Sequence, residues 1–210
     1  MSQPEPDQQP DRPDDQAPLE LTDPRAMRAL AHPLRLAILE HLDLEGTATA
    51  TECGRATGES PQACSYHLRA LAKWGFVRLA ESGDGRETRW ALAARGVTWA
   101  SGAEASPEYQ AASSLLKARV LERDARAVSD FFRYEAELEP EWREAAHFMS
   151  ASIHATPREL EELGRGIAEL LARLRRTRRE ERPEGARPVH VVVRAVPRVA
   201  ADRPARKEIT

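Results

Sequence analysis

The chain has 210 residues, of which 41% are hydrophobic and 31% are charged, and its net charge is -3. This length suits one sizeable domain or two small ones. No apolar run approaches the roughly 20 residues that a membrane-spanning helix needs, and the first residues lack the basic and apolar regions of a signal peptide. The two cysteines make no disulfide framework. These features exclude an integral membrane protein and lead us to expect a cytoplasmic one.

Both ends of the chain differ from its middle in composition. Residues 1–20 are rich in proline, glutamine and aspartate and hold almost no apolar residues, so we expect a disordered acidic tail there. Residues 198–210 have no apolar periodicity and are expected to be disordered as well. Because the acidic tail lowers the net charge of the whole chain, a basic surface elsewhere has to be judged from local residues.

Helix starts are marked in the middle of the chain because a capping residue repeatedly precedes proline, which the first helical turn tolerates well. In the third helix, Thr49 and Glu52 have the spacing of a capping box, and Gly58 suits a helix end. The pattern predicts four helices in succession, over residues 24–30, 33–46, 49–57 and 60–74.

Two strand-like runs follow the fourth helix, at residues 76–80 and 88–92. They flank Ser82-Gly83-Asp84-Gly85-Arg86, a sequence with strong turn chemistry, which predicts a β-hairpin. Four helices followed by a hairpin predict a winged helix-turn-helix domain over residues 21–100. The expected fold class is therefore mainly α with a β-hairpin wing.

The third and fourth helices fit a unit whose first helix crosses the DNA backbone while its second lies in the major groove. In the fourth helix, Cys64, Leu68 and Leu71 recur at helical spacing and are expected to face the core. The other face and the wing carry residue types that bind bases and phosphates. The candidate DNA contacts are Ser60, Gln62, Ser65, Tyr66, Arg69, Lys73, Arg86 and Arg89. We expect base contacts from Gln62, Ser65, Tyr66 and Arg69, and backbone contacts from Lys73, Arg86 and Arg89.

Three stretches carry a family resemblance: ALAHPLRLAILE at residues 29–40, SPQACSYHLRALAKWGFV at residues 60–77 and ESGDGRETRW at residues 81–90. In this order they closely resemble the ArsR-type winged-helix repressors, over less than half of the chain. The resemblance implies a homodimer on a palindromic operator, which usually represses and is released by a metal, a small molecule or another stimulus. It also implies base contacts from the exposed face of the fourth helix.

Cys53 and Cys64 call for comparison with those ArsR-type sensors that bind metals through cysteines. The third helix has a single cysteine where the thiolate-type sensors carry a pair, and Cys64 falls on the apolar face as a small core residue. The long helix after the wing has no histidine for the family's other metal site. We therefore expect no metal and no cofactor. Without a nucleophile motif or a Gly-rich phosphate loop, we expect no enzyme.

After a linker that begins near residue 101, a long amphipathic helix is predicted over residues 107–138. Its apolar residues recur at steps of three and four and form a wide stripe that needs a partner. The stripe either packs on its own domain or forms a dimer, as the family resemblance implies, and we favour the dimer. The candidate dimer contacts are Leu116, Val120, Phe131 and Phe132.

Residues 139–197 are expected to form a small α/β appendage. The pattern predicts a strand over residues 146–154, a helix from Pro157 to about Arg176, and a strand over residues 189–196, whose valine run is the clearest strand signal in the chain. Such an appendage binds an effector, extends the dimer or holds a partner protein, and the resemblance does not decide among these roles.

The sequence as a whole predicts a sequence-specific transcriptional regulator. Its expected partners are double-stranded DNA, a second copy of the chain in a homodimer, and an unknown effector, with no membrane partner, and we expect it to repress. Two alternatives stay open. One is a winged helix used as a protein-interaction module, which the acidic overall charge favours. The other is an effector-responsive sensor with its ligand site in the C-terminal half.

Overall fold

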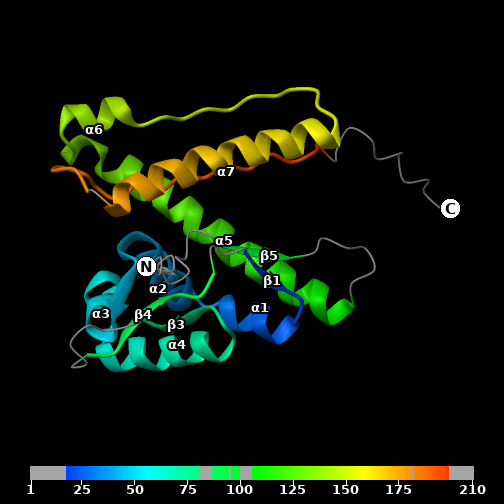
Figure 1. The fold of residues 1–210 in the computed structure, drawn as a ribbon. Coiled ribbons are helices and arrows are strands. Elements are labelled where there is room, and N and C mark those ends of the chain that lie inside the picture. The colour runs from blue at the N-terminus through cyan, green and yellow to red at the C-terminus, as the bar shows by residue number, and fades with distance from the viewer. Residues whose placement is uncertain (1–17, 81–86, 95, 100–105, 181, 199–210) are drawn as a thin grey trace, which may run out of the picture. The chain divides into compact units, whose positions relative to one another are not determined.

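A computed structural model describes residues 18–80, 87–94, 96–99, 106–180 and 182–198 of the protein. The chain divides into two compact units, residues 1–137 and residues 138–210 (Figure 1). The helix-turn-helix and the wing belong to the first unit, and the predicted appendage belongs to the second.

The first four helices of this unit follow in the predicted order: α1 (Pro24–Leu30), α2 (Pro33–Glu45), α3 (Ala50–Thr57) and α4 (Pro61–Lys73). The residue before each helix accepts a hydrogen bond from a backbone N–H of the first turn, which satisfies one of the donors that a helix start leaves open. These capping residues are Asp23, His32, Thr49 and Ser60. The predicted helix starts are thus confirmed, including the capping box of Thr49 and Glu52.

The predicted wing is present as an antiparallel pair, β3 (Val77–Leu79) and β4 (Arg89–Leu92). A third strand, β2 (Thr47–Thr49), pairs with the other edge of β4, so the sheet order is β2-β4-β3. The sequence analysis missed β2 because three residues between a helix end and a helix cap show no alternation. This strand attaches the wing to the start of α3.

A second, two-stranded sheet joins the beginning of the domain to the segment after the wing. In it, β1 (Leu19–Leu21) pairs in parallel with β5 (Val97–Trp99). Leu19 and Glu20 fall within the predicted disordered tail, so the boundary at residue 20 was placed too late. Its pairing partner, β5, lies far along the chain, so the composition of residues 1–20 gives no indication of the pairing.

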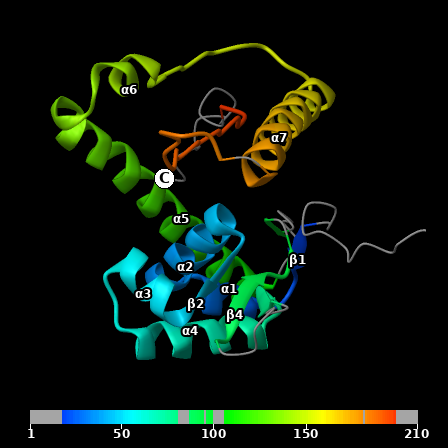
Figure 2. The ribbon, with the colours of Figure 1, turned by 60° about the vertical axis from the view of Figure 1, so that its left-hand side comes forward.

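The core of the first unit lies between α1–α4 and a long fifth helix, α5 (Pro107–Tyr134). Figures 1 and 2 show α4 along the outer edge of this unit, with the wing strands beside it. Among the described residues, the largest fully buried side chains are Met27, Ile38, Leu42, Leu68, Leu71 and Leu116. The domain is therefore organised around the buried faces of its helices, among them the face that the helical spacing predicted for α4.

α5 ends at Tyr134, earlier than predicted, and the chain then forms a short 3-10 turn over Glu135–Glu137. Leu116 is only 1% exposed and Val120 packs against the same core. Both residues were expected to contact a dimer partner. For Leu116 this expectation is corrected, because its side chain is buried in the core of its own domain. Val120 is half-buried, and its expected contact stays a prediction. For this part of α5, the alternative of packing on its own domain applies.

The second unit contains α6 (Pro140–Ala145) and α7 (Pro157–Glu180). The α/β character expected for this unit is wrong, because the described residues 146–154 and 189–196 form no strand. Valine and isoleucine favour extended backbone, but a strand also needs a neighbouring strand to pair with. α6 was missed because Glu139 gives no side-chain cap to mark its start.

Among the described residues, no helix combines the length and the apolar character that crossing a membrane would require.

Candidate nucleic-acid interface

α4 is held in the domain by one apolar face. Cys64, Leu68 and Leu71 are buried, as their helical spacing predicted. At the start of the helix, the hydroxyl of Ser60 accepts a hydrogen bond from the backbone N–H of Ala63 at 3.1 Å. Ser60 is therefore a capping residue in this structure, and its expected contact with DNA stays a prediction.

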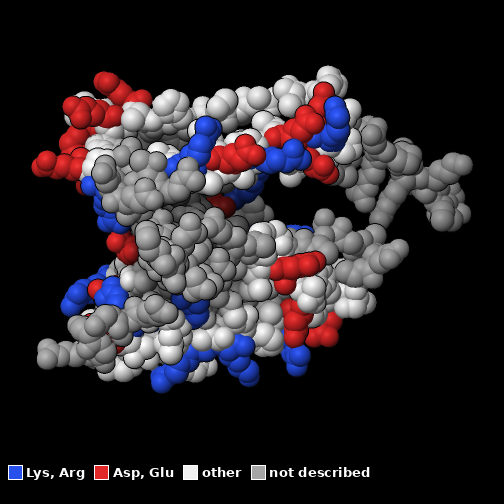
Figure 3. All heavy atoms as spheres, in the orientation of Figure 1, with Lys and Arg blue, Asp and Glu red and all other residues white. Residues whose placement is uncertain are grey.

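The opposite face of α4 is polar and open to solvent. The structure brings the predicted residues onto one ridge, with Gln62, Tyr66, Arg69 and Lys73 exposed and Ser65 half-buried. Arg69 makes no hydrogen bond or ion pair with any residue that the structure describes, and α4 contains no acidic residue. Figure 3 shows Lys and Arg side chains along the lower edge of the first unit, where α4 lies. The ridge presents amide, hydroxyl, phenol and cationic groups to solvent.

α3 and α4 approach each other closely at their turn. A Cβ atom on Gly54 would lie 2.7 Å from the carbonyl oxygen of Glu59, so only glycine fits there without a backbone shift. The Glu59 N–H donates back to the Gly54 carbonyl at 3.1 Å. Gly58 ends α3 at a φ of 74°, a conformation that favours glycine. These two glycines set the angle at which α4 leaves α3.

Arg89 is bound within the protein. Its guanidinium donates to the hydroxyl of Thr47 at 3.2 Å and to the carbonyl of Thr47 at 3.2 Å, and it pairs with the carboxylate of Glu52 at 3.1 Å. The hydrogen bond from the Thr49 N–H is the main cause that lowers the pKa of Glu52, and Arg89 lowers it further. Arg89 therefore joins β4 to β2 and to the start of α3. Arg86, the other predicted wing contact, lies outside the described residues.

The position of His67, which the helical pattern left undefined, is between α2 and α4. Its ring centroid lies 4.5 Å from that of His32, and its Nδ1 accepts a hydrogen bond from Nε of Arg35 at 3.2 Å. The His32 Nδ1 accepts from the Leu34 N–H at 3.2 Å. Desolvation is the main cause that lowers the pKa of both rings. The charge of Arg35 lowers the pKa of His32 further, and His32 and Arg35 lower the pKa of His67 further. Both rings thus accept hydrogen bonds in their neutral form. The bond from Arg35 to His67 and the contact between the two rings join α2 to α4.

The two cysteines are buried in the core rather than exposed to a ligand. Desolvation raises the pKa of the Cys53 thiol to about 11, so this thiol is protonated at neutral pH. The hydroxyl of Thr57 contacts the Cys64 sulfur at 3.7 Å. Within the part of the chain that the structure describes, no three His, Cys, Asp or Glu side chains gather as a metal site would require.

Two exposed cations near the helix-turn-helix were not predicted. Arg55 lies in the last turn of α3 and Arg78 lies in β3. The alternation of β3, with Val77 buried and Arg78 exposed, was the available signal for Arg78, because successive side chains in a strand point to opposite faces. Both residues add positive charge to the unit that carries the α4 ridge.

Comparison with known families supports the helix-turn-helix assignment. Residues 30–80, which run from the end of α1 past β3, match a family described as a helix-turn-helix domain. No curated protein matches the chain.

Two solved structures resemble the chain at low identity. One is the homodimeric winged helix-turn-helix DNA-binding domain of a possible ArsR-family transcriptional regulator from Mycobacterium bovis, with 22% identity, a TM-score of 0.30, and coverage of 53% of this chain and 81% of that one. The other is a MarR family protein from Mycobacterium tuberculosis in complex with salicylic acid, with 18% identity, a TM-score of 0.28, and coverage of 70% and 85%. The fold assignment rests on the family match and on the elements described above.

Proposed function

We propose that this protein is a sequence-specific DNA-binding transcriptional regulator whose α4 enters the major groove. The observation that carries the proposal is the exposed ridge of Gln62, Tyr66, Arg69 and Lys73 on a helix without acidic residues. Arg69 has no partner among the described residues, so its five donors are open to a guanine edge or a phosphate. The match of residues 30–80 to helix-turn-helix domains supports this role.

The ridge divides into two kinds of contact. The residues from the first turn to the centre of α4 would contact base edges: Gln62, Ser65, Tyr66 and Arg69. Lys73, in the last turn, would neutralise a phosphate. Arg86 would contact the DNA backbone from the wing. For Arg89, the contacts to Thr47 and Glu52 favour a positioning role instead.

We further propose that the protein acts in the cytoplasm as a homodimeric repressor on a palindromic operator. Two-fold symmetry would set two α4 helices about 34 Å apart, one turn of DNA. Since Leu116 is buried in the core, a contact through α5 would use its exposed stripe of Leu121, Val128 and Phe132, beside the half-buried Val120. Phe132 would contact the partner as expected from the sequence. The ring centroid of Phe131 lies 5.8 Å from that of Phe132.

The proposal is tested by fluorescence anisotropy with the duplex upstream of the protein's own gene and with a shuffled duplex, each at two salt concentrations. We expect tighter, salt-sensitive binding to the native duplex, because each neutralised phosphate releases counterions. Equal binding to both duplexes would leave the operator to be found by random-site selection. If neither duplex bound at low salt, the protein-interaction alternative would replace this proposal.

Two variants of the ridge separate base contacts from phosphate contacts. Arg69→Ala should weaken binding to the native duplex by roughly 1–3 kcal/mol and lower its preference over the shuffled duplex. Lys73→Ala should weaken both duplexes alike and reduce the salt slope by about 1. Arg126→Ala, which removes an exposed cation on α5, serves as the control. An Arg69→Ala protein with unchanged affinity would show that α4 is not docked as proposed.

A further inference from the structure

The cations that precede α5 divide into two groups. Among the described residues of this stretch, four are bound to groups of their own domain: Arg25, Arg28, Arg35 and Arg89. The other four are exposed and make no hydrogen bond or ion pair with any described residue: Arg55, Arg69, Lys73 and Arg78. These four lie on α3, α4 and β3, so the unpaired positive charge gathers on the helix-turn-helix and its wing.

The opposite charge is concentrated in residues 1–17, which lie outside the described residues. The charged side chains of this acidic segment are five carboxylates and one guanidinium: Glu5, Asp7, Asp11, Asp14 and Asp15, with Arg12. The segment also holds four prolines and very few apolar residues, so its composition does not suit burial in a core. Its charge suits a basic surface.

The acidic segment joins the domain close to one end of α4. It leads into β1 and then α1, where the guanidinium of Arg25 in the first turn lies 5.9 Å from the ring centroid of Trp74. Trp74 directly follows Lys73 at the end of α4. Residues 1–17 can extend over roughly 60 Å, whereas α4 is about 20 Å long. The segment is therefore long enough to follow the whole α4 ridge.

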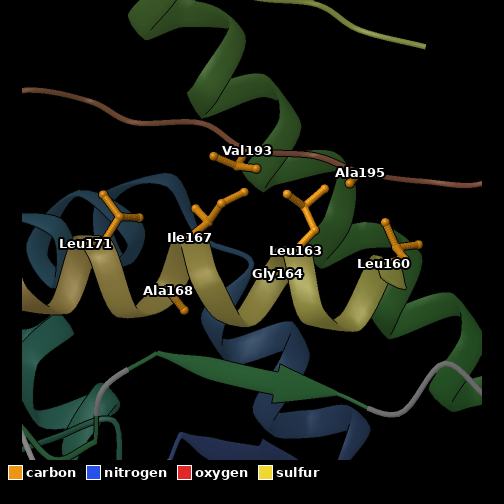
Figure 4. A pocket seen from close by; sticks show the side chains of 8 residues that line it. All are labelled: Leu160, Leu163, Gly164, Ile167, Ala168, Leu171, Val193 and Ala195. Carbon is orange, nitrogen blue, oxygen red and sulfur yellow. The ribbon is translucent and has the colours of Figure 1, made fainter. Parts of the chain in front are cut away.

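Two other surfaces suit the acidic segment less well. A groove of about 310 Å³ between α7 and the segment that includes Val193 and Ala195 is lined by apolar side chains and a glycine, so it offers no charge to a carboxylate (Figure 4). The arginine-rich end of the C-terminal helix is interrupted by Glu180 and Glu181, whereas α4 contains no acidic residue. Of these surfaces, the α4 ridge has the charge most complementary to residues 1–17.

We propose that residues 1–17 dock on the α4 ridge of their own chain and compete there with DNA. The carboxylates take the place of DNA phosphates beside Arg69 and Lys73, and the covalent connection keeps their effective concentration high. The apparent dissociation constant for DNA then rises as the fraction of chains with an uncovered ridge falls. This inference rests on the proposed function, because it names a second ligand for the same ridge.

Carbodiimide cross-linking of the full chain tests the docking without DNA. The reagent joins a carboxylate to an amine in contact with it, and the chain has three lysines: Lys73, Lys117 and Lys207. Lys73 lies on the α4 ridge, and Lys117, which is exposed on α5, is the matched control. Acetylation by a small reagent measures the reactivity of each amine, and the cross-link yields are corrected for it.

In the monomer band at low salt, cross-links from residues 5–15 to Lys73 should exceed those to Lys117 by at least several-fold. They should decrease at about 0.5 M salt, where the charges are screened. Equal yields at Lys73 and Lys117, or no cross-link to Lys73, would overturn the docking.

Neutralising the acidic segment in the full chain tests the competition with DNA. The neutral variant carries Glu5→Gln, Asp7→Asn, Asp11→Asn, Asp14→Asn and Asp15→Asn. The matched control removes the same charge from exposed positions of the second unit: Glu141→Gln, Glu144→Gln, Glu161→Gln, Glu169→Gln and Glu184→Gln. At low salt, the neutral variant should bind both the native and the shuffled duplex at least several-fold more tightly than the control.

This difference should narrow as the salt concentration rises. Equal affinities of the two variants would show that residues 1–17 act only through net charge, and would overturn the competition. If neither variant bound any duplex, the proposed function itself would fail, and the cross-links to Lys73 would still decide whether the acidic segment docks on α4.

Discussion

The guanidinium of Arg89 shows how a residue type suited to DNA can be taken up by the protein itself. Its charge meets the carboxylate of Glu52, and its other donors reach two oxygen atoms of Thr47. An arginine fork satisfies several acceptors at once, which is why it suits such a junction. Arg69, by contrast, has no such partner among the residues that the structure describes. The two arginines look alike in the sequence and differ only in what surrounds them.

Arg89→Ala should therefore act on stability. We expect a loss of about 1 kcal/mol in the free energy of unfolding, since the pair is partly exposed and part of its gain is screened. Urea unfolding of the variant and the parent protein measures it, and Lys73→Ala is the control that should keep the parent's stability. A stable Arg89→Ala protein whose salt slope for DNA falls by about 1 would instead assign Arg89 to a phosphate.

At the scale of elements, the contact between α3 and α4 depends on a backbone approach that only glycine allows. The Glu59 carbonyl oxygen occupies the space where a Cβ on Gly54 would lie. Because that oxygen belongs to the backbone of the turn, it cannot move away without moving the start of α4. The helix-turn-helix geometry is thus sensitive to one methyl group.

Gly54→Ala should destabilise the first unit by about 1–3 kcal/mol, the usual cost of an extra methyl group in a closely packed site. Alanine is the better helix former, so helix propensity alone predicts the opposite sign. Denaturant unfolding measures the change, with Ala56→Ser at an exposed position of α3 as the control, expected to stay within about 0.5 kcal/mol of the parent. A stabilised Gly54→Ala protein would contradict the close approach described here.

At the scale of the whole first unit, the neutral His32 and His67 rings couple stability to pH. In the unfolded chain both rings ionise near the ordinary pKa of 6.5, and in the folded chain their pKa values are lowered. The unfolded state therefore binds more protons as the pH falls below about 6.5. The contribution of these rings is fully present above that pH and is lost below it.

Denaturant midpoints measured between about pH 7.5 and about pH 5.5 should accordingly fall as the solution becomes more acidic. The double variant His32→Asn, His67→Asn should show a flatter dependence, because asparagine does not titrate and remains a good N-cap at position 32. If the double variant kept the full slope of the parent, the dependence would come from other groups.

The sequence by itself determined the starts of the first four helices, the two paired strands of the wing and the exposed polar ridge of α4. Capping residues before proline act within one turn, the turn chemistry between residues 82 and 86 acts within one hairpin, and the spacing of Cys64, Leu68 and Leu71 shows directly which face of α4 is buried. Signals of this kind depend on neighbours a few residues away. They can therefore be recognised before any tertiary contact is known.

Only the tertiary structure showed which of the expected contact residues are already bound or buried within the protein. Arg89 binds Thr47 and Glu52, Leu116 packs in the core, and β1 pairs with β5. Each of these contacts joins residues that are far apart in the sequence. The valines of residues 189–196 were predicted as a strand from propensity alone, yet pairing requires a neighbour that this segment does not find among the described residues. Local preference is a property of the residue, whereas burial, ion pairing and strand pairing are properties of the residues that the fold brings together.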